Sequence, residues 1–222
     1  MIIEIKGVIV PDNEKWIYDL FGMQAISPSV IAEQLTSANG EDITVLINSD
    51  GGEIFAGSEI YEMFRTYQGN LTIKVVGLAA SAASVVACAR QSEIAPTGML
   101  MIHNVFGGAE GDYHTMDKTS EVLKKANKAQ ANAYASKTGK PMDELLRLMD
   151  EETWITADEA VELGFIDSIS KAADNKVYKL AAARYDSGLL PREVIHKYQN
   201  QKAAKKAQAS LELLNLKNSR RS

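Results

Sequence analysis

Hydrophobic residues in the first hundred positions form short runs that alternate with helical patterns. Residues 43–47 form a continuous apolar run of the kind that is typical of strands buried on both faces, and the β-branched segment 71–76 is expected to be another buried strand. Between them, the apolar residues of 55–67 recur at helical spacing. The same reasoning predicts a strand over 2–10, a helix that begins at Ser27-Pro28 and ends before Gly40, a tight polar turn over 48–52, a helix of small residues over 81–89, and short strands over 94–95 and 99–102. This order predicts an α/β fold with a parallel sheet and right-handed crossovers.

The second half of the chain has a different, mainly helical pattern. A glycine-rich connection follows His103, and a long helix is expected over about 112–137, with a narrow stripe that is mostly alanine. Such a stripe is suited to close helix packing or to a contact between subunits. Later signals are a helix that begins at Pro141, a capping box from Thr156 to Glu159, a helix end at Gly164 and a last strand over 165–169. We expect one domain over 1–170 and a C-terminal extension over 171–222, either a basic helix or a flexible tail.

Composition and charge narrow the range of partners. The chain has 222 residues, of which 45% are hydrophobic and 24% charged, as in soluble globular proteins. Residues 196–222 hold seven basic residues and one acidic residue, so this tail carries +6 and the remainder −11 of the net charge of −5. The acidic body gives no reason to expect nucleic-acid binding. The basic tail suits an acidic partner or nucleic acid, but such a run is more often a solvated helix or a frayed end.

Targeting and redox signals point to the cytoplasm. The start of the chain lacks the basic region and apolar core of a signal peptide, and no run is long and apolar enough to span a membrane. The single cysteine, Cys88, cannot form an internal disulfide and lies in an alanine-rich segment, which predicts a small buried residue in a reducing compartment.

Ser81 is a candidate nucleophile. It lies in a run of very small residues just after a predicted strand, where the backbone can turn sharply and a substrate can approach the serine oxygen. His103 ends a later apolar strand and is placed to act as its general base. The alternatives are a packing serine and a satisfied core histidine. The other two histidines, His114 and His196, lie in a polar helix start and near the tail.

Two further segments carry polar groups suited to catalysis. Asn48–Gly52 lies between a buried strand and a helix, so its paired glycines predict an oxyanion hole or a simple turn. The consecutive carboxylates Asp150, Glu151 and Glu152 predict either a residue that orients the histidine or a solvated helix end. No cluster has the spacing of metal ligands, so neither a metal nor another cofactor is expected.

Taken in order, these segments resemble the ClpP-like (caseinolytic protease-like) serine peptidases. The motifs are Ile47-Asn48-Ser49-Asp50-Gly51-Gly52, where Asp50 replaces the family's proline, then Gly77-Leu78-Ala79-Ala80-Ser81-Ala82, Met101-Ile102-His103 and the segment from Thr156 to Asp167. The resemblance covers residues 2–170 and implies a ClpP/crotonase-like spiral of β-α units from which the long helix protrudes as a handle that packs rings together. The order serine, histidine, acid also differs from that of the α/β-hydrolases.

The resemblance implies a role for each matching residue. Ser81 would be the nucleophile and His103 the base. The acid, normally an aspartate, would be Glu152, with Asp150 as the alternative. The backbone N–H groups of Gly52 and Ala82 would form the oxyanion hole. An extended substrate would pair with three consecutive residues, Glu53, Ile54 and Phe55.

The family also implies partners and assembly. The expected protein is a serine endopeptidase that cleaves peptides, unfolded proteins or scaffold proteins inside a self-assembled ring, with no membrane partner. Pairing with an ATPase unfoldase is open, because the long N-terminal segment of the family is missing. The segment 21–29 and the Glu-Thr-Trp stretch look more like phage head-maturation proteases, which act in the host cytoplasm or the prohead. Rival interpretations are an enoyl-CoA hydratase-like acyl-CoA enzyme and a catalytically silent assembly protein.

Overall fold

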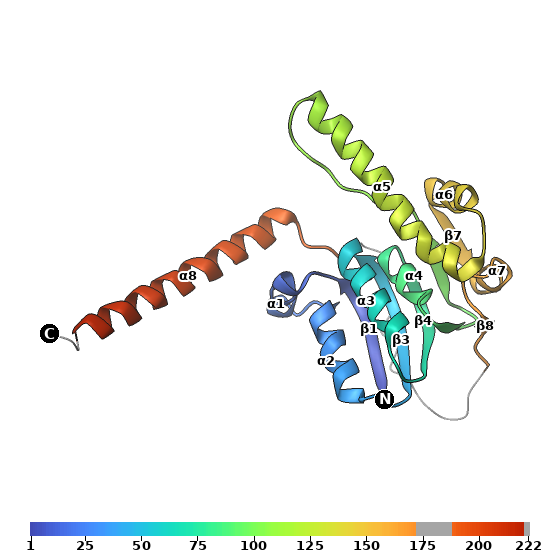
Figure 1. Cartoon of the computed structure of the whole chain (residues 1–222), viewed down its shortest axis with the longest axis horizontal. Coiled ribbons are helices and arrows are strands. Elements are labelled where there is room, and N and C mark those ends of the chain that lie inside the picture. The colour runs from blue at the N-terminus through green and yellow to red at the C-terminus, as the bar shows by residue number, and fades with distance from the viewer. Residues whose placement is uncertain (172–187, 220–222) are drawn as a thin grey trace.

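A single sheet forms the centre of the computed structural model of the chain, which describes residues 1–171 and 188–219 (Figure 1). In chain order the elements are β1 (Ile2–Ile9), α1 (Asp12–Leu20), β2 (Ala25–Ile26), α2 (Pro28–Ala38), β3 (Ile43–Gly52), α3 (Ile54–Thr66), β4 (Leu71–Ala80), α4 (Ala82–Ala87), β5 (Gln91–Ile94), β6 (Met99–Ile102), α5 (Tyr113–Thr138), α6 (Met142–Asp150), β7 (Thr153–Thr156), α7 (Ala157–Glu162), β8 (Ser168–Ile169) and α8 (Arg192–Ser219).

The strands pair in the order β2-β1-β3-β4-β5-β8, while β6 pairs with the end of β4 and β7 pairs with β6. Each described pair is parallel except β6–β7. The predicted α/β fold with a parallel sheet is therefore confirmed.

Apolar side chains explain why the central strands pair. Ile5, Ile47 and Val75 lie side by side on β1, β3 and β4, and all three are completely buried. Burying each contributes roughly 1.5–3 kcal/mol relative to exposure. Helices α2, α3 and α4 cover one face of these strands (Figure 1), and burial alternates along the first part of β4, where Thr72 and Lys74 are half-buried between the buried Leu71, Ile73 and Val75.

The end of β3 differs from the sequence prediction. Residues 48–52 are not a separate turn, because β3 continues through them and pairs Val8 with Gly51 after a register shift. Polar side chains replace the ladder at the shift: the Ser49 hydroxyl donates to the carbonyl of Gly7 at 2.6 Å, and the side-chain oxygen of Asn48 accepts from the N–H of Leu78 at 2.9 Å. These bonds keep the last residues of β3, including Gly51 and Gly52, within the sheet.

Helix α5 agrees closely with the long helix predicted over about 112–137. Its far half extends away from the sheet, and α6 packs beside its near half (Figure 1). The predicted capping box between Thr156 and Glu159 is present at the start of α7. By contrast, the last strand is shorter than expected, and the short elements α1, β2 and β7 were not predicted.

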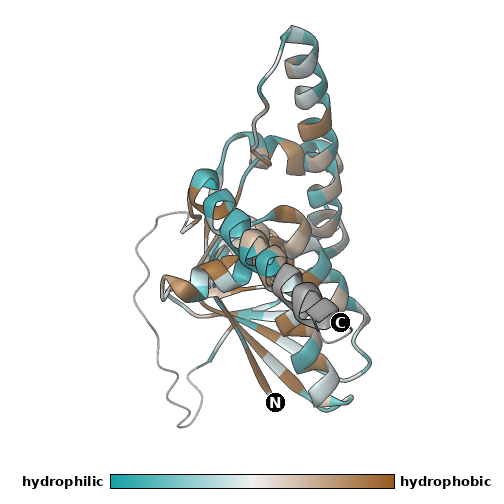
Figure 2. Cartoon of the chain, turned by 90° about the vertical axis from the view of Figure 1, so that its left-hand side faces the viewer, coloured by the Kyte–Doolittle hydropathy of each residue, from teal (hydrophilic) through white to brown (hydrophobic). Residues whose placement is uncertain are grey.

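Helix α8 begins against α1 and then projects from the body (Figure 1). Ile195 in its first turn packs with Ile17 and Tyr18 and is only 2% exposed. Figure 2 shows the contrast between the hydrophobic strands and the hydrophilic stretches of α8. Residues 172–187 and 220–222, which belong to the predicted extension, lie outside the described residues, and the domain division there stays a prediction. In the described part of the chain, no helix combines the length and apolar character needed to cross a membrane.

Candidate active site

Ser81 lies at the sharp bend between β4 and α4. Its backbone has φ 54° and ψ −126°, a conformation that residues other than glycine rarely adopt. Its N–H donates to the carbonyl of Met101 on β6 at 2.9 Å, which fixes the bend to the neighbouring strand. Strained backbone of this kind is concentrated at functional sites, where the surrounding structure holds it in place.

His103 follows β6 and reaches the serine. Its Nε2 atom lies 2.8 Å from Oγ of Ser81, which is hydrogen-bond distance. The half-buried position of the ring lowers the pKa of His103, and the charge of Glu152 opposes this by raising it. A lowered pKa keeps the imidazole neutral near pH 7, the form able to accept the serine proton.

The three consecutive carboxylates have different surroundings. The antiparallel pair β6–β7 ends with Ile102 opposite Thr153, and Glu152 lies just before this pair, in a turn where its φ is 48°. Its charge acts on the pKa of His103, which follows Ile102. Asp150 instead accepts a hydrogen bond from the side-chain amide of Asn104 at 2.6 Å. Glu151 forms an exposed ion pair with Arg147 at 2.9 Å.

A buried polar chain supports the bend from behind. The Ser84 hydroxyl donates to the carbonyl of Ser81 at 2.6 Å, and the oxygen of Ser84 lies 2.7 Å from the hydroxyl of Tyr134 on α5. Because the single hydrogen of Ser84 is used by Ser81, Tyr134 is the donor in the second bond. Ser84 therefore connects the backbone of Ser81 to α5.

Gly51, Gly52 and Ala82 lie close together beside the serine. A Cβ added to Gly51 would be 2.9 Å from the backbone nitrogen of Ala82, and both Gly52 and Ala82 line the cavity that contains Ser81. The end of β3 and the start of α4 therefore meet at the two backbone positions that were predicted to form an oxyanion hole.

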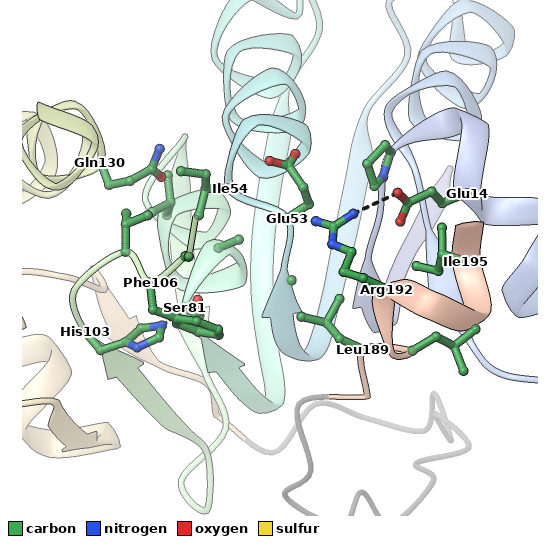
Figure 3. Close-up of a pocket in the computed structure, with 18 of the residues that line it drawn as sticks. Glu14, Glu53, Ile54, Ser81, His103, Phe106, Gln130, Leu189, Arg192 and Ile195 are labelled. Carbon is green, nitrogen blue, oxygen red and sulfur yellow. Dashed lines mark hydrogen bonds and ion pairs between the residues drawn. The ribbon is translucent and has the colours of Figure 1, made fainter. Parts of the chain in front are cut away.

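Ser81 and His103 open into a cavity of about 680 Å³ (Figure 3). Glu53 and Ile54 line it, whereas Phe55 is 66% exposed and is not among the lining residues. The structure also changes the expected pairing of 53–55 with a substrate strand. Ile54 and Phe55 form the first turn of α3, with Glu53 as the N-cap, so an extended ladder cannot continue through them.

The C-terminal segment forms a wall of this cavity that sequence reasoning missed. Its lining residues are Leu189, Leu190, Pro191, Arg192 and Ile195. Arg192 pairs with Glu14 on α1 at 3.0 Å (Figure 3), and the N–H of Leu190 donates to the hydroxyl of Tyr18 at 3.1 Å. In the sequence, the only signal of this docking is the short apolar run Leu189-Leu190-Pro191 before the basic tail.

The remaining candidates lie elsewhere. His114 packs against Tyr113 at the start of α5, and His196 is exposed on α8. Cys88 is buried, as predicted, and its burial raises the pKa of the thiol to about 12. Across residues 1–171 and 188–219, no group of histidine, cysteine and acidic side chains is arranged to hold a metal ion.

Comparison with known proteins places this site in a family. The model of the Clp protease family matches residues 23–173, a range that contains Ser81, His103 and Glu152. The ATP-dependent Clp protease proteolytic subunit of Bacteroides fragilis is 35% identical over 133 residues, which are 59% of this chain and 64% of that protein. The corresponding subunit of Porphyromonas gingivalis is 33% identical, over 59% of this chain and 60% of that protein. The chain thus spans less than two thirds of the length of these relatives.

A solved structure supports the same fold. A ClpP1 mutant from Listeria monocytogenes superposes with a TM-score of 0.65 and 21% identity, over 78% of this chain and 92% of that chain. At this identity the likeness concerns the fold, and it agrees with the fold expected from the sequence. Since the family model covers more than half of the sequence, the chain belongs to the Clp protease family.

Proposed function

We propose that this protein is a serine peptidase in which Ser81 is the nucleophile and His103 the general base. The observation that carries the proposal is the 2.8 Å contact between Nε2 of His103 and Oγ of Ser81, at the mouth of a cavity large enough for a peptide segment. Membership of the Clp protease family supports the same chemistry.

The proposed reaction follows the acyl-enzyme route. As Oγ of Ser81 forms a bond to the scissile carbonyl carbon, its proton moves to Nε2 of His103. The oxyanion of the tetrahedral intermediate accepts hydrogen bonds from the backbone N–H groups of Gly52 and Ala82. Nε2 then gives its proton to the leaving amine as the C–N bond breaks. A water molecule attacks the acyl carbon while His103 takes its proton, and His103 returns this proton to Oγ of Ser81 as the ester C–O bond breaks.

Glu152 is the proposed third member. Two observations support this role: Glu152 directly precedes Thr153, which pairs with Ile102 next to His103, and its charge raises the pKa of the histidine, as is needed to stabilise an imidazolium. Asp150 is the weaker candidate because its carboxylate already accepts from Asn104.

The proposed substrates are peptides or unfolded proteins, bound along Glu53 and Ile54 and the C-terminal wall. A self-assembled ring is proposed from the family, with the projecting α5 as a contact between copies. The relatives are named as ATP-dependent subunits, so an ATPase partner is a proposal as well. The narrower expectation of phage head maturation gains no support from these relatives, which are bacterial, and the cytoplasmic setting stays a prediction.

The test is covalent labelling of the full chain by a fluorophosphonate probe together with cleavage of a fluorogenic peptide. Ser81→Ala is expected to lose both signals, whereas Ser37→Ala, on the exposed side of α2, keeps them. Undiminished labelling of Ser81→Ala would overturn the assignment. An assembled wild-type protein without labelling would favour a silent assembly protein, and CoA-thioester binding an acyl-CoA enzyme.

A further inference from the structure

The segment that follows His103 is held by a network of side-chain amides. The N–H of Val105 donates to the side-chain oxygen of Asn127 on α5 at 2.6 Å. The side-chain nitrogen of Asn127 donates to the side-chain oxygen of Asn104 at 2.7 Å. The side-chain nitrogen of Asn104 donates in turn to the carboxylate of Asp150 at 2.6 Å. This amide network therefore ties the two residues after the proposed base to α5 and to the end of α6.

The two ends of the amide network fix the orientation of both amides. The backbone N–H of Val105 can only donate, so Asn127 must present its oxygen to that group. The nitrogen of Asn127 then faces Asn104, which must present its own oxygen. This leaves the nitrogen of Asn104 for Asp150, whose ionised carboxylate can only accept. Turning over either amide would break two hydrogen bonds at once, so the network has one arrangement.

The segment held in this way also contacts the imidazole. Phe106, the next residue along the chain, lies against His103 with the two ring centroids 5.6 Å apart. Residues 104–106 therefore follow the histidine in sequence and also pack on its ring. A movement of this segment would shift the imidazole and with it the 2.8 Å contact between Nε2 of His103 and Oγ of Ser81.

The needs of α5 itself do not explain an asparagine at position 127. Asn127 lies in the middle of a 26-residue helix, where asparagine is a weaker helix former than alanine. Its half-buried side chain uses both its oxygen and its nitrogen in contacts with the segment after β6. A residue that served only helix stability or solvation would need neither contact.

We propose that Asn127 is a positioning residue for the general base: its carboxamide holds the segment after His103, and with it the imidazole, within reach of Ser81. Asp150 anchors the far end of the same network. A small displacement of a reacting group slows catalysis strongly, since a shift of about 1 Å can cost about 100-fold in rate. This inference rests on the proposed peptidase function and adds a residue to the support of the same site.

The first experiment compares Asn127→Ala with wild-type protein in peptide cleavage and in the rate of fluorophosphonate labelling. Both kcat and the labelling rate are expected to fall by about 10-fold, because both depend on the contact between Ser81 and His103. The loss is smaller than the maximum because the N–H of Asn104 keeps its bond to the carbonyl of Met149.

The Michaelis constant separates this role from one in substrate binding. KM of Asn127→Ala is expected to stay within about threefold of wild type, and a change confined to KM would show that the network only shapes the cavity wall. Asn132→Ala, at an exposed position of the same helix, is the matched control and should keep both rates. Equal losses in the two variants, or no loss in Asn127→Ala, would overturn the inference.

A reversal of the amide network tests the mechanism without changing Asn127. Asn104→Asp alone brings two carboxylates together and is expected to lower kcat by at least about 10-fold. Adding Asp150→Asn supplies an amide that donates to the new carboxylate, whose second oxygen still accepts from Asn127. The double variant is expected to recover kcat to within about threefold of wild type. A double variant no faster than Asn104→Asp would overturn the inference.

Failure of this inference differs from failure of the proposed function. If wild-type protein is not labelled by the fluorophosphonate probe and cleaves no peptide, the peptidase function fails. If wild-type protein and Asn127→Ala are labelled at the same rate, the function stands and the role of Asn127 is rejected. Because the reversed network keeps Asn127, it decides the inference even where Asn127→Ala does not fold.

Discussion

Gly51 packs directly against Ser81: a Cβ added to the glycine would lie 2.8 Å from Cβ of the serine and 2.5 Å from the carbonyl oxygen of Ala80. The end of β3 therefore touches the bend that presents the nucleophile. This contact explains why a glycine pair and a serine among alanines, 30 positions apart in the sequence, occur in one chain. Small residues on both sides let two backbones approach within van der Waals distance.

Gly51→Ala is expected to damage both stability and the site. Its backbone has φ 90°, which an alanine adopts only with strain, and the new methyl group would push the Ser81 bend away from His103. We expect a loss of about 2–4 kcal/mol in the free energy of unfolding and loss of fluorophosphonate labelling. Urea denaturation and labelling measure the two effects.

Gly40→Ala is the matched control for this change. Gly40 has a similar φ of 85°, but an added Cβ meets nothing within 4 Å. Gly40→Ala should therefore lose only about 1 kcal/mol in the free energy of unfolding, because of backbone strain, and should keep full labelling. Equal losses in both variants would show that packing against Ser81 does not matter.

The pH dependence of peptide cleavage should report the environment of His103. Burial lowers the pKa of His103 below its ordinary value of 6.5, and the base must be neutral to accept the Ser81 proton. The kcat/KM for peptide cleavage should therefore stay nearly constant as the pH falls to 6.5 and decrease only below pH 6.5. A kcat/KM profile with an acid limb above pH 6.5 would contradict this environment.

Glu152→Gln should change both the rate and this profile. Loss of the charge removes the effect that raises the His103 pKa, so the acid limb moves to still lower pH. We expect kcat to fall by about 10²- to 10⁴-fold, because the imidazolium formed in the reaction loses its counter-charge. Glu152→Asp, which keeps the charge, should recover part of the rate. Asp150→Asn serves as the control and should have a much smaller effect, and the opposite ranking would make Asp150 the acid.

The choice between these two carboxylates shows where sequence reasoning reached its limit. Ser81 and His103 could be predicted because each follows a recognisable apolar strand, and strand ends on one edge of a sheet lie close together. Glu152 and Asp150 could not be separated, because the answer depends on the register of β7, a four-residue strand too short to give a periodic signal.

Contacts between distant helices were equally hidden in the sequence. Tyr134 and Gln130 interrupt an alanine-rich stripe, but nothing local shows that α5 meets α4 at Tyr134 and α3 at Gln130. The same holds for Ile195, whose partners on β1 and α1 are nearly two hundred positions away. Periodicity identifies a buried face, while the identity of the covering element depends on tertiary packing.

Removal of the hydroxyl groups behind the serine should destabilise the protein to different extents. Tyr134→Phe deletes one donor and leaves Ser84 bound to Ser81, so we expect a loss of about 1 kcal/mol. Ser84→Ala leaves the fully buried Tyr134 hydroxyl and the Ser81 carbonyl without this partner and should cost about 2–3 kcal/mol. Urea denaturation of both single variants and the double variant gives the coupling between the two hydroxyls. Additive losses would contradict the contact.

Docking of α8 onto α1 should depend on Ile195. Its side chain is 2% exposed among Val8, Val10, Ile17 and Tyr18, so Ile195→Asp would bury an unpaired charge in an apolar cluster. The start of α8 should then detach, which exposes Lys197 and Lys202 to trypsin and removes Tyr198 from Trp16, a contact of 6.5 Å between ring centroids. We expect at least about 10-fold faster cleavage in α8 and a changed tryptophan emission, since a loss of 1.4 kcal/mol in docking already shifts the equilibrium tenfold.

Ala204→Asp, on the exposed part of the same helix, is the control and should leave both signals unchanged. If the two variants are cleaved at the same rate as wild type, α8 is not held by Ile195, and the wall that it forms in the substrate cavity would have to be anchored by other contacts, such as the Arg192–Glu14 ion pair and the Leu190–Tyr18 hydrogen bond.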